Sequence, residues 1–204
     1  MQINFLQKPC HAVSGLMEKT YPKPKYSANN TLYSGKFKLQ VMNFLFLSGA
    51  DGTGKTHDLK ELKKELLKRN FVVIKILRTY NNDFIAILQK KDDGKYVLIN
   101  SSSDNSTALE KLQVFVQNEC ISKGIKLDTV ISSLRENTDS IRQDFWDYFV
   151  SNHNLQLNNN TVVDIPMGHP RKEPQRNNSR KFLTETTLNL ILHILRLPPF
   201  QLIP

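Results

Sequence analysis

Continuous apolar runs alternate with amphipathic stretches from residue 43 onward, and this alternation predicts the secondary structure. Within 43–48, residues 44–47 (Phe-Leu-Phe-Leu) form a continuous apolar run, which is typical of a strand buried on both faces of a sheet. Residues 55–68 carry leucines at helical spacing between lysines and glutamates, which predicts an amphipathic helix. The other expected elements are strands at 71–77, 84–88, 96–99, 129–134 and 161–165 and helices at 107–120, 140–150 and 183–197.

The order of these elements predicts the α/β class. Strands that alternate with helices are joined by crossovers, so most of them run parallel and the helices cover both faces of the sheet. The stretch 91–95 (Lys-Asp-Asp-Gly-Lys) lies between two strands and predicts a hairpin turn. We therefore expect a mostly parallel sheet with helices on both faces.

Residues 1–41 show a different pattern from the rest of the chain. They contain Pro9, Pro22 and Pro24 and no sustained periodicity, so we expect a basic, poorly organised N-terminal extension. Met42 directly precedes the first strand, which favours the hypothesis that 1–41 is an appendage or an upstream-start artefact. The expected divisions are an extension at 1–41, a core at 42–165, a basic linker or loop at 166–182 and a C-terminal helix at 183–204 that packs on the core.

The net charge of +9 belongs to the flanks of the chain rather than to its middle. Residues 1–40 carry a net charge of +5 and residues 166–204 carry +4, whereas residues 41–165 contain 16 basic and 16 acidic residues. Basic flanks are compatible with weak nucleic-acid contact through phosphates, and equally with simple solvation. The charge therefore does not by itself indicate a nucleic-acid-binding core.

The two cysteines, Cys10 and Cys120, lie far apart and form no metal-binding spacing, so we expect reduced thiols in a cytoplasmic protein. No apolar run approaches the ~20 residues that cross a bilayer, so no membrane partner is expected. The histidines form no ligand set.

A glycine-rich loop at 49–56 carries the strongest chemical signal. Its residues, which match G-x-x-x-x-G-K-[ST] in full, are Gly49, Ala50, Asp51, Gly52, Thr53, Gly54, Lys55 and Thr56. Glycines leave backbone N–H groups free to surround phosphates, Lys55 is placed to bind the outer phosphates, and Thr56 offers a hydroxyl to Mg²⁺. The preceding strand and following helix supply the context that the motif requires. The sequence thus predicts a nucleotide-binding site for ATP or GTP with Mg²⁺, and His57 is expected near the nucleotide.

A magnesium site also needs an acidic group at the end of a neighbouring strand. Asp104 follows the strand 96–99 and is the expected metal residue, with helix capping as its alternative role. Asn100 or Ser101 is the alternative lining of the site. Asp128 precedes its strand and is expected to be a solvated charge.

Phosphoryl transfer is helped by a cation that neutralises the transferring group. Arg135, just past the strand 129–134, is the expected catalytic arginine beside Lys55, and Arg142 is a weaker candidate. Arg78, at the end of the second strand, is a candidate for binding an acceptor's phosphate.

Taken together, the chain resembles the P-loop NTPase superfamily and, within it, the small nucleotide and nucleoside kinases. The loop 49–56 is similar to the G-x-D-G-x-G-K-T loop of thymidylate kinases, including its acid at Asp51. The resemblance implies a three-layer P-loop NTPase fold with a five-stranded parallel sheet, and transfer of a γ-phosphate to a nucleoside monophosphate. It places Asp51 over the acceptor phosphates. The family's elements after the second and third strands are replaced here by 77–82 and 100–106, so the resemblance leaves the acceptor open.

Two functions follow from these observations. The first is a Mg-dependent phosphotransferase, a small kinase that acts on a nucleotide-like or other small acceptor. The second is a regulatory or accessory P-loop NTPase switch that binds or hydrolyses nucleotide to control a protein or nucleic-acid partner. A kinase needs a second pocket beside the loop, whereas a switch needs a segment that reorders with the γ-phosphate.

Overall fold

The computed structural model describes residues 42–50, 52–79, 82–102, 105–135, 139–153, 162–168 and 176–204, and the expected extension at 1–41 lies outside them. All of the described residues belong to one compact unit, residues 36–204. In chain order the elements are β1 (Asn43–Gly49), α1 (Lys55–Lys68), β2 (Phe71–Arg78), β3 (Phe84–Lys90), β4 (Tyr96–Asn100), α2 (Ser106–Glu119), the short 3₁₀ helix η2 (Ile121–Lys123), β5 (Leu127–Arg135), α3 (Asp139–His153), β6 (Val162–Pro166) and α4 (Arg176–Arg196).

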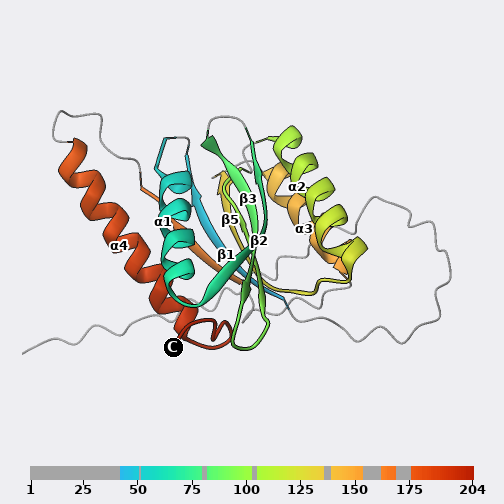
Figure 1. The fold of residues 1–204 in the computed structure, drawn as a ribbon. Coiled ribbons are helices and arrows are strands. Elements are labelled where there is room, and N and C mark those ends of the chain that lie inside the picture. The colour runs from blue at the N-terminus through green and yellow to red at the C-terminus, as the bar shows by residue number, and fades with distance from the viewer. Residues whose placement is uncertain are drawn as a thin grey trace, which may run out of the picture. The chain divides into compact units, whose positions relative to one another are not determined.

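The strands form one mixed sheet in the order β2-β3-β4-β5-β1-β6 (Figure 1). Strands β4, β5, β1 and β6 run parallel, whereas β2 and β3 are antiparallel to their neighbours. The predicted α/β class with a mostly parallel sheet is confirmed. The five-stranded parallel sheet implied by the resemblance is wrong, because only residues 79–83 link β2 to β3. A connection this short joins antiparallel strands, since parallel neighbours need a crossover of a dozen or more residues.

Each face of the sheet packs against its own pair of helices. In β1, Leu45 and Leu47 point to the face covered by α1 and α4, and Phe44 and Phe46 point to the face covered by α2 and α3. This alternation follows from the two-residue period of a strand. Aliphatic side chains dominate the first face, and aromatic rings of β1 and α3 stack edge to face on the second. The expected burial of the first strand on both sides is confirmed.

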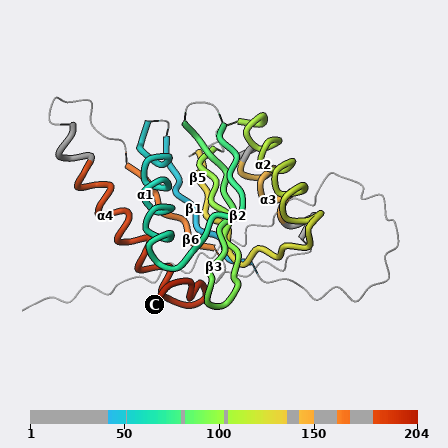
Figure 2. The backbone as a smooth tube through the Cα atoms, viewed as in Figure 1, coloured from blue at the N-terminus to red at the C-terminus, as the bar shows by residue number. Residues whose placement is uncertain are grey.

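The chain leaves β1 and β5 toward opposite faces of the sheet. These two strands are parallel neighbours, yet β1 continues into α1 on one face and β5 continues into α3 on the other (Figure 2). In open α/β sheets, ligands bind outside the carboxyl ends of the strands at such a switch point. The glycine loop, which follows β1 directly, therefore lies where this architecture places ligands.

Helix α4 begins at Arg176, earlier than the expected start at 183 and inside the expected linker. Residues 176–181 are polar all round, so they give no amphipathic signal in the sequence. The following turns carry the apolar face, with Ile191 and Leu195 buried against the sheet. Within the described residues, no helix has the length and apolarity needed to cross a membrane.

Candidate functional site

The glycine loop has a backbone that side chains other than glycine rarely adopt. Gly52 has φ +77° and Gly54 has φ +98°, both in the left-handed region. Gly54 is also the N-cap of α1, and its carbonyl accepts the Asp58 N–H at 3.0 Å. The loop therefore delivers the chain into the N-terminus of α1, where backbone N–H groups and the helix dipole favour an anion.

Gly49 is required for a different reason, which is the close approach of another segment. A Cβ atom at Gly49 would lie 2.8 Å from the backbone oxygen of Met167 and 3.0 Å from its Cβ. Met167 follows β6 and donates its N–H to the Ser48 oxygen at 2.6 Å. The start of the loop is thus held between β1 and the end of β6, with no room for a side chain.

The Lys55 ammonium lies inside the curve of the loop. Lys55 is buried, and its Nζ donates to the backbone oxygens of Gly49 at 2.7 Å and Ala50 at 2.8 Å. The Thr53 hydroxyl donates to the same Ala50 oxygen at 3.0 Å. The positive charge is therefore centred where the loop turns, close to the Gly49 and Ala50 oxygens and 3.4 Å from Thr53 Oγ1. An anion in the loop would compete for that ammonium with full charges.

Thr56 is paired with an acid that the sequence reasoning missed. Its Oγ1 donates to Asp83 Oδ1 at 2.7 Å, and the Ser101 hydroxyl lies 3.3 Å from the same oxygen. Asp83 stands just before β3, whose antiparallel direction puts its first residue at the carboxyl end of β4. No sequence motif joins residues 27 positions apart; only the placement of β3 in the sheet brings them together.

Of the expected catalytic cations, Arg135 lies beside the loop. It is the last residue of β5 and is the register partner of Gly49 in the β1–β5 pair. It is partly exposed at the strand tip. His57, expected near the nucleotide, follows Thr56 on an exposed position of α1. Asp51 and Asp104, the other expected site residues, lie outside the described residues.

Arg142, the weaker candidate for the catalytic cation, forms an ion pair with an acid of β6. Its Nη2 lies 2.6 Å from Asp164 Oδ2 on β6, and the other oxygen of Asp164 accepts the Ser48 hydroxyl at 2.5 Å. The arginine also lies 6.0 Å from the centre of the Phe46 ring. This cluster ties α3, β6 and the end of β1 together on the aromatic face, directly before Gly49. Sequence reasoning missed Asp164 because its partner on α3 is 22 residues away.

Arg78, the last residue of β2, lies near Lys63 of α1. Arg78 is the register partner of Phe84, and Lys63 Nζ lies 4.6 Å from the centre of the Phe84 ring. Burial lowers the pKa of Lys63, and repulsion from Arg78 and Lys60 lowers it further. Two positive charges therefore lie near Phe84, the residue that follows Asp83.

Two further expected residues have structural partners. Asn100, at the end of β4, is fully buried and donates from Nδ2 to Ser132 Oγ at 3.0 Å, which joins β4 to β5. Asp128, expected to be a solvated charge, is partly buried and also accepts a backbone hydrogen bond. Its Oδ2 accepts the Tyr96 N–H at 2.8 Å, at the point where the β4–β5 register shifts. The carboxylate thus accepts a hydrogen bond from the Tyr96 N–H at a position where the β4–β5 pairing is irregular.

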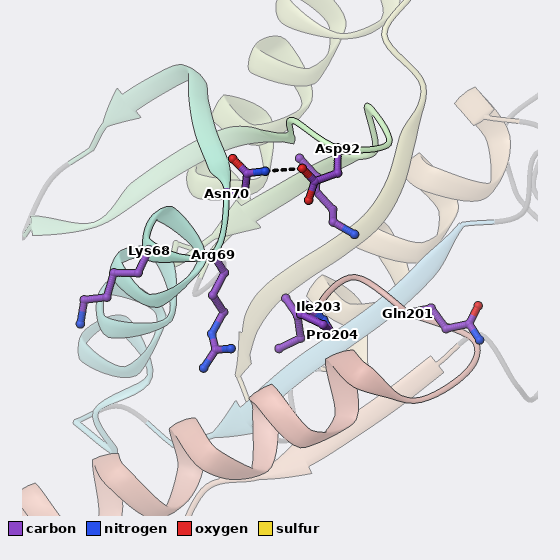
Figure 3. A pocket seen from close by; sticks show the side chains of 8 residues that line it. Lys68, Arg69, Asn70, Asp92, Gln201, Ile203 and Pro204 are labelled. Atoms are coloured by element: carbon purple, nitrogen blue, oxygen red, sulfur yellow. Dashed lines mark hydrogen bonds between the residues drawn. The ribbon is translucent and has the colours of Figure 1, made fainter.

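A cavity of about 510 Å³ lies at the other end of the sheet. Figure 3 shows its lining, which includes the end of α1 at Lys68 and Arg69, and Asp92 of the β3–β4 turn. Helix α1 runs 14 residues from the glycine loop to this cavity, which is roughly 21 Å at 1.5 Å per residue. The cavity is therefore remote from the loop. Within the described part of the chain, no three His, Cys, Asp or Glu side chains group as a metal site.

No protein-family model matches this sequence, and no curated protein matches it. Among solved structures, a chain titled "Crystal structure of APE1195" is 12% identical, with 79% of this chain and 80% of that chain covered at a TM-score of 0.32. A likeness of that size carries no argument about the fold or the function.

Proposed function

We propose that this chain binds ATP or GTP with Mg²⁺ through residues 49–56 and is a phosphotransferase, a small kinase of a nucleotide-like or other small acceptor. The observation that carries the proposal is the arrangement of the loop: a buried strand, two glycines with positive φ and a buried lysine whose ammonium lies within the turn. A triphosphate needs backbone donors, a cation and a helix N-terminus converging on one point. The three-layer P-loop NTPase fold is part of the same proposal.

Lys55, Thr56 and Arg135 have separate roles in this proposal. Lys55 exchanges its contacts with the Gly49 and Ala50 oxygens for contacts with phosphate oxygens. Thr56 faces the metal, which when bound neutralises charge on the phosphates. Arg135 lies level with Gly49 across the β1–β5 pair and supplies a positive charge to the group in transfer.

A kinase also needs a place for its acceptor, and this favours transfer over a nucleotide switch. Lys63 and Arg78 place two positive charges near Phe84, the residue that follows Asp83. An acceptor that carries a phosphate would bind these cations through charge-assisted hydrogen bonds. We therefore place the acceptor on the β2–β3 side of the loop.

The test is a phosphate-transfer screen with ATP, Mg²⁺ and a panel of nucleosides and nucleoside monophosphates, with Lys55→Ala as the control. Transfer to any acceptor by the natural chain, absent in Lys55→Ala, is the expected result. Hydrolysis without transfer would favour the regulatory NTPase switch. A natural chain that binds no nucleotide in a calorimetric titration would overturn the proposal.

A further inference from the structure

Resting on the proposed function, we propose that Asp83 supplies the carboxylate of the magnesium site and acts through Thr56. A hydroxyl has one proton and two lone pairs, so a threonine that gives a lone pair to a cation must place its proton elsewhere. The Thr56 proton already points to Asp83 Oδ1, at 2.7 Å. The lone pairs of Thr56 are thereby left for the metal.

The donor set fits magnesium that arrives with a nucleotide. Mg²⁺ keeps several waters and is usually bound through one or two carboxylates together with substrate phosphates, rather than by a cage of protein ligands. A single carboxylate beside Thr56 suits this pattern, and so does the finding that no cluster of three metal-binding side chains occurs among the described residues. Asp83 would hold a metal-bound water, as outer-shell carboxylates do.

Two other described acids lie near the loop, and one of them, Asp58 in the first turn of α1, is buried. Asp164 is neutralised by Arg142 and also accepts the Ser48 hydroxyl. Strand β5, the neighbour of β1, ends in Ser132-Ser133-Leu134-Arg135 and offers no carboxylate. Asp83, by contrast, forms no ion pair with a described lysine or arginine. Its charge is therefore available to a cation.

The backbone on both sides of Asp83 is fixed. The Thr79 N–H donates to the Asp83 oxygen at 2.9 Å, which closes the β2–β3 connection. Directly after it, the Phe84 N–H donates to Ser101 Oγ at 2.8 Å, and the Ser101 N–H donates to the Phe84 oxygen at 2.9 Å. A carboxylate held this way keeps its position when the metal binds, which is the requirement for a positioning residue.

Asp83→Asn separates charge from shape, because an amide oxygen still accepts the Thr56 proton. In a titration of the full chain with a fluorescent ATP analogue, we expect the Mg²⁺ concentration for half-maximal binding to rise by roughly 10–100-fold. In EDTA, the affinity of Asp83→Asn for the analogue should equal that of the natural chain. Asp92→Asn, which removes one negative charge on the remote β3–β4 turn, is the matched control and should leave both titrations unchanged.

An unaltered Mg²⁺ requirement in folded Asp83→Asn would overturn the inference while leaving the proposed function intact. Failure of the natural chain to bind the analogue at all would instead remove the proposed function. If Asp83→Asn does not fold, the inference is tested on the natural chain by NMR. Paramagnetic Mn²⁺ with ATP should broaden the carboxyl NMR signal of Asp83 far more than that of Asp92, and equal broadening would contradict the inference.

Discussion

The two ends of helix α1 lie in regions rich in charge that differ in how the charges are paired. At its first residue, the Lys55 ammonium is buried and contacts backbone oxygens of the glycine loop. At its last residue, Lys68 is exposed and pairs with Glu65 one turn away. The first end of the helix thus presents a buried ammonium surrounded by backbone oxygens, whereas the last end presents an exposed lysine paired with a neighbouring carboxylate.

The cavity belongs to the second region. Two of its lining residues have local partners: Lys90 lies 3.2 Å from Asp93 in the adjoining turn, and Asn70 donates to Asp92. The largest well-formed pocket is usually the first hypothesis for a binding site. We favour the glycine loop instead, because a buried ammonium and the N-terminus of α1 converge there.

The largest expected effect comes from removing the charge at the loop. Lys55→Ala should weaken binding of ATP with Mg²⁺ by about 100-fold, since charge-assisted hydrogen bonds contribute roughly 1.5–3 kcal/mol and each 1.4 kcal/mol is tenfold in affinity. Calorimetric titration measures this directly. Lys68→Ala, at the other end of the same helix, is the matched control and should bind as the natural chain does. Equal losses in both variants would erase the contrast between the two ends.

Gly49→Ala tests the close packing of the loop. Its Cβ would meet the Met167 backbone at 2.8 Å, so the end of β6 must move. We expect a loss of roughly 1–3 kcal/mol in the free energy of unfolding, as for other overpacked positions, together with weaker nucleotide binding. Urea unfolding measures the first quantity and calorimetry the second.

Gly124→Ala supplies the comparison at the other end. Gly124 has φ +66° with no atom within 4 Å of an added Cβ, so only backbone strain is introduced. The expected cost is about 1 kcal/mol, without any change in nucleotide affinity. If Gly49→Ala bound nucleotide normally, the loop would be less tightly fixed than its contacts imply.

Local patterns in the sequence were enough to predict much of this fold. Helix α1 occupies 55–68 as expected, because its leucines, its glycine cap and its charged face all favour the same element. The strand before it and the loop between them follow from an apolar run and a motif of eight residues. Each of these features depends on residues that are close together in the sequence, where patterns of apolar and polar residues are most informative.

The missed features depend on contacts between distant segments. Asp83 meets Thr56 only because β3 runs antiparallel, and β2 and β3 give the same apolar signal in either direction. The ion pair between Arg142 and Asp164 joins α3 to β6, and no local pattern in the sequence indicates it. Charge and hydroxyl partners cannot be assigned before the order and direction of the strands are known.

A smaller effect, on turnover rather than binding, is expected for Arg135. Its place beside Gly49 predicts contact with the phosphoryl group during transfer. Arg135→Ala should lower kcat by about tenfold, the value of one charge-assisted hydrogen bond at its weak end, while the Kd for ATP stays constant. Steady-state kinetics with the acceptor found in the transfer screen, alongside calorimetry, separates the two. Arg135→Lys should recover part of the rate, whereas a matching fall in ATP affinity would assign Arg135 to nucleotide binding.

The smallest effect is expected at the cavity, in Arg69→Met. Arg69 Nε is buried, and no residue that the structure describes accepts a hydrogen bond from it. A buried donor without a partner costs free energy, so a methionine that keeps the apolar stem should raise the free energy of unfolding by up to ~1 kcal/mol. Urea unfolding measures this change, and nucleotide titration should show none. A marked loss of ATP affinity in folded Arg69→Met would mean that the cavity contributes to nucleotide binding. The two ends of α1 would then not differ in function as proposed.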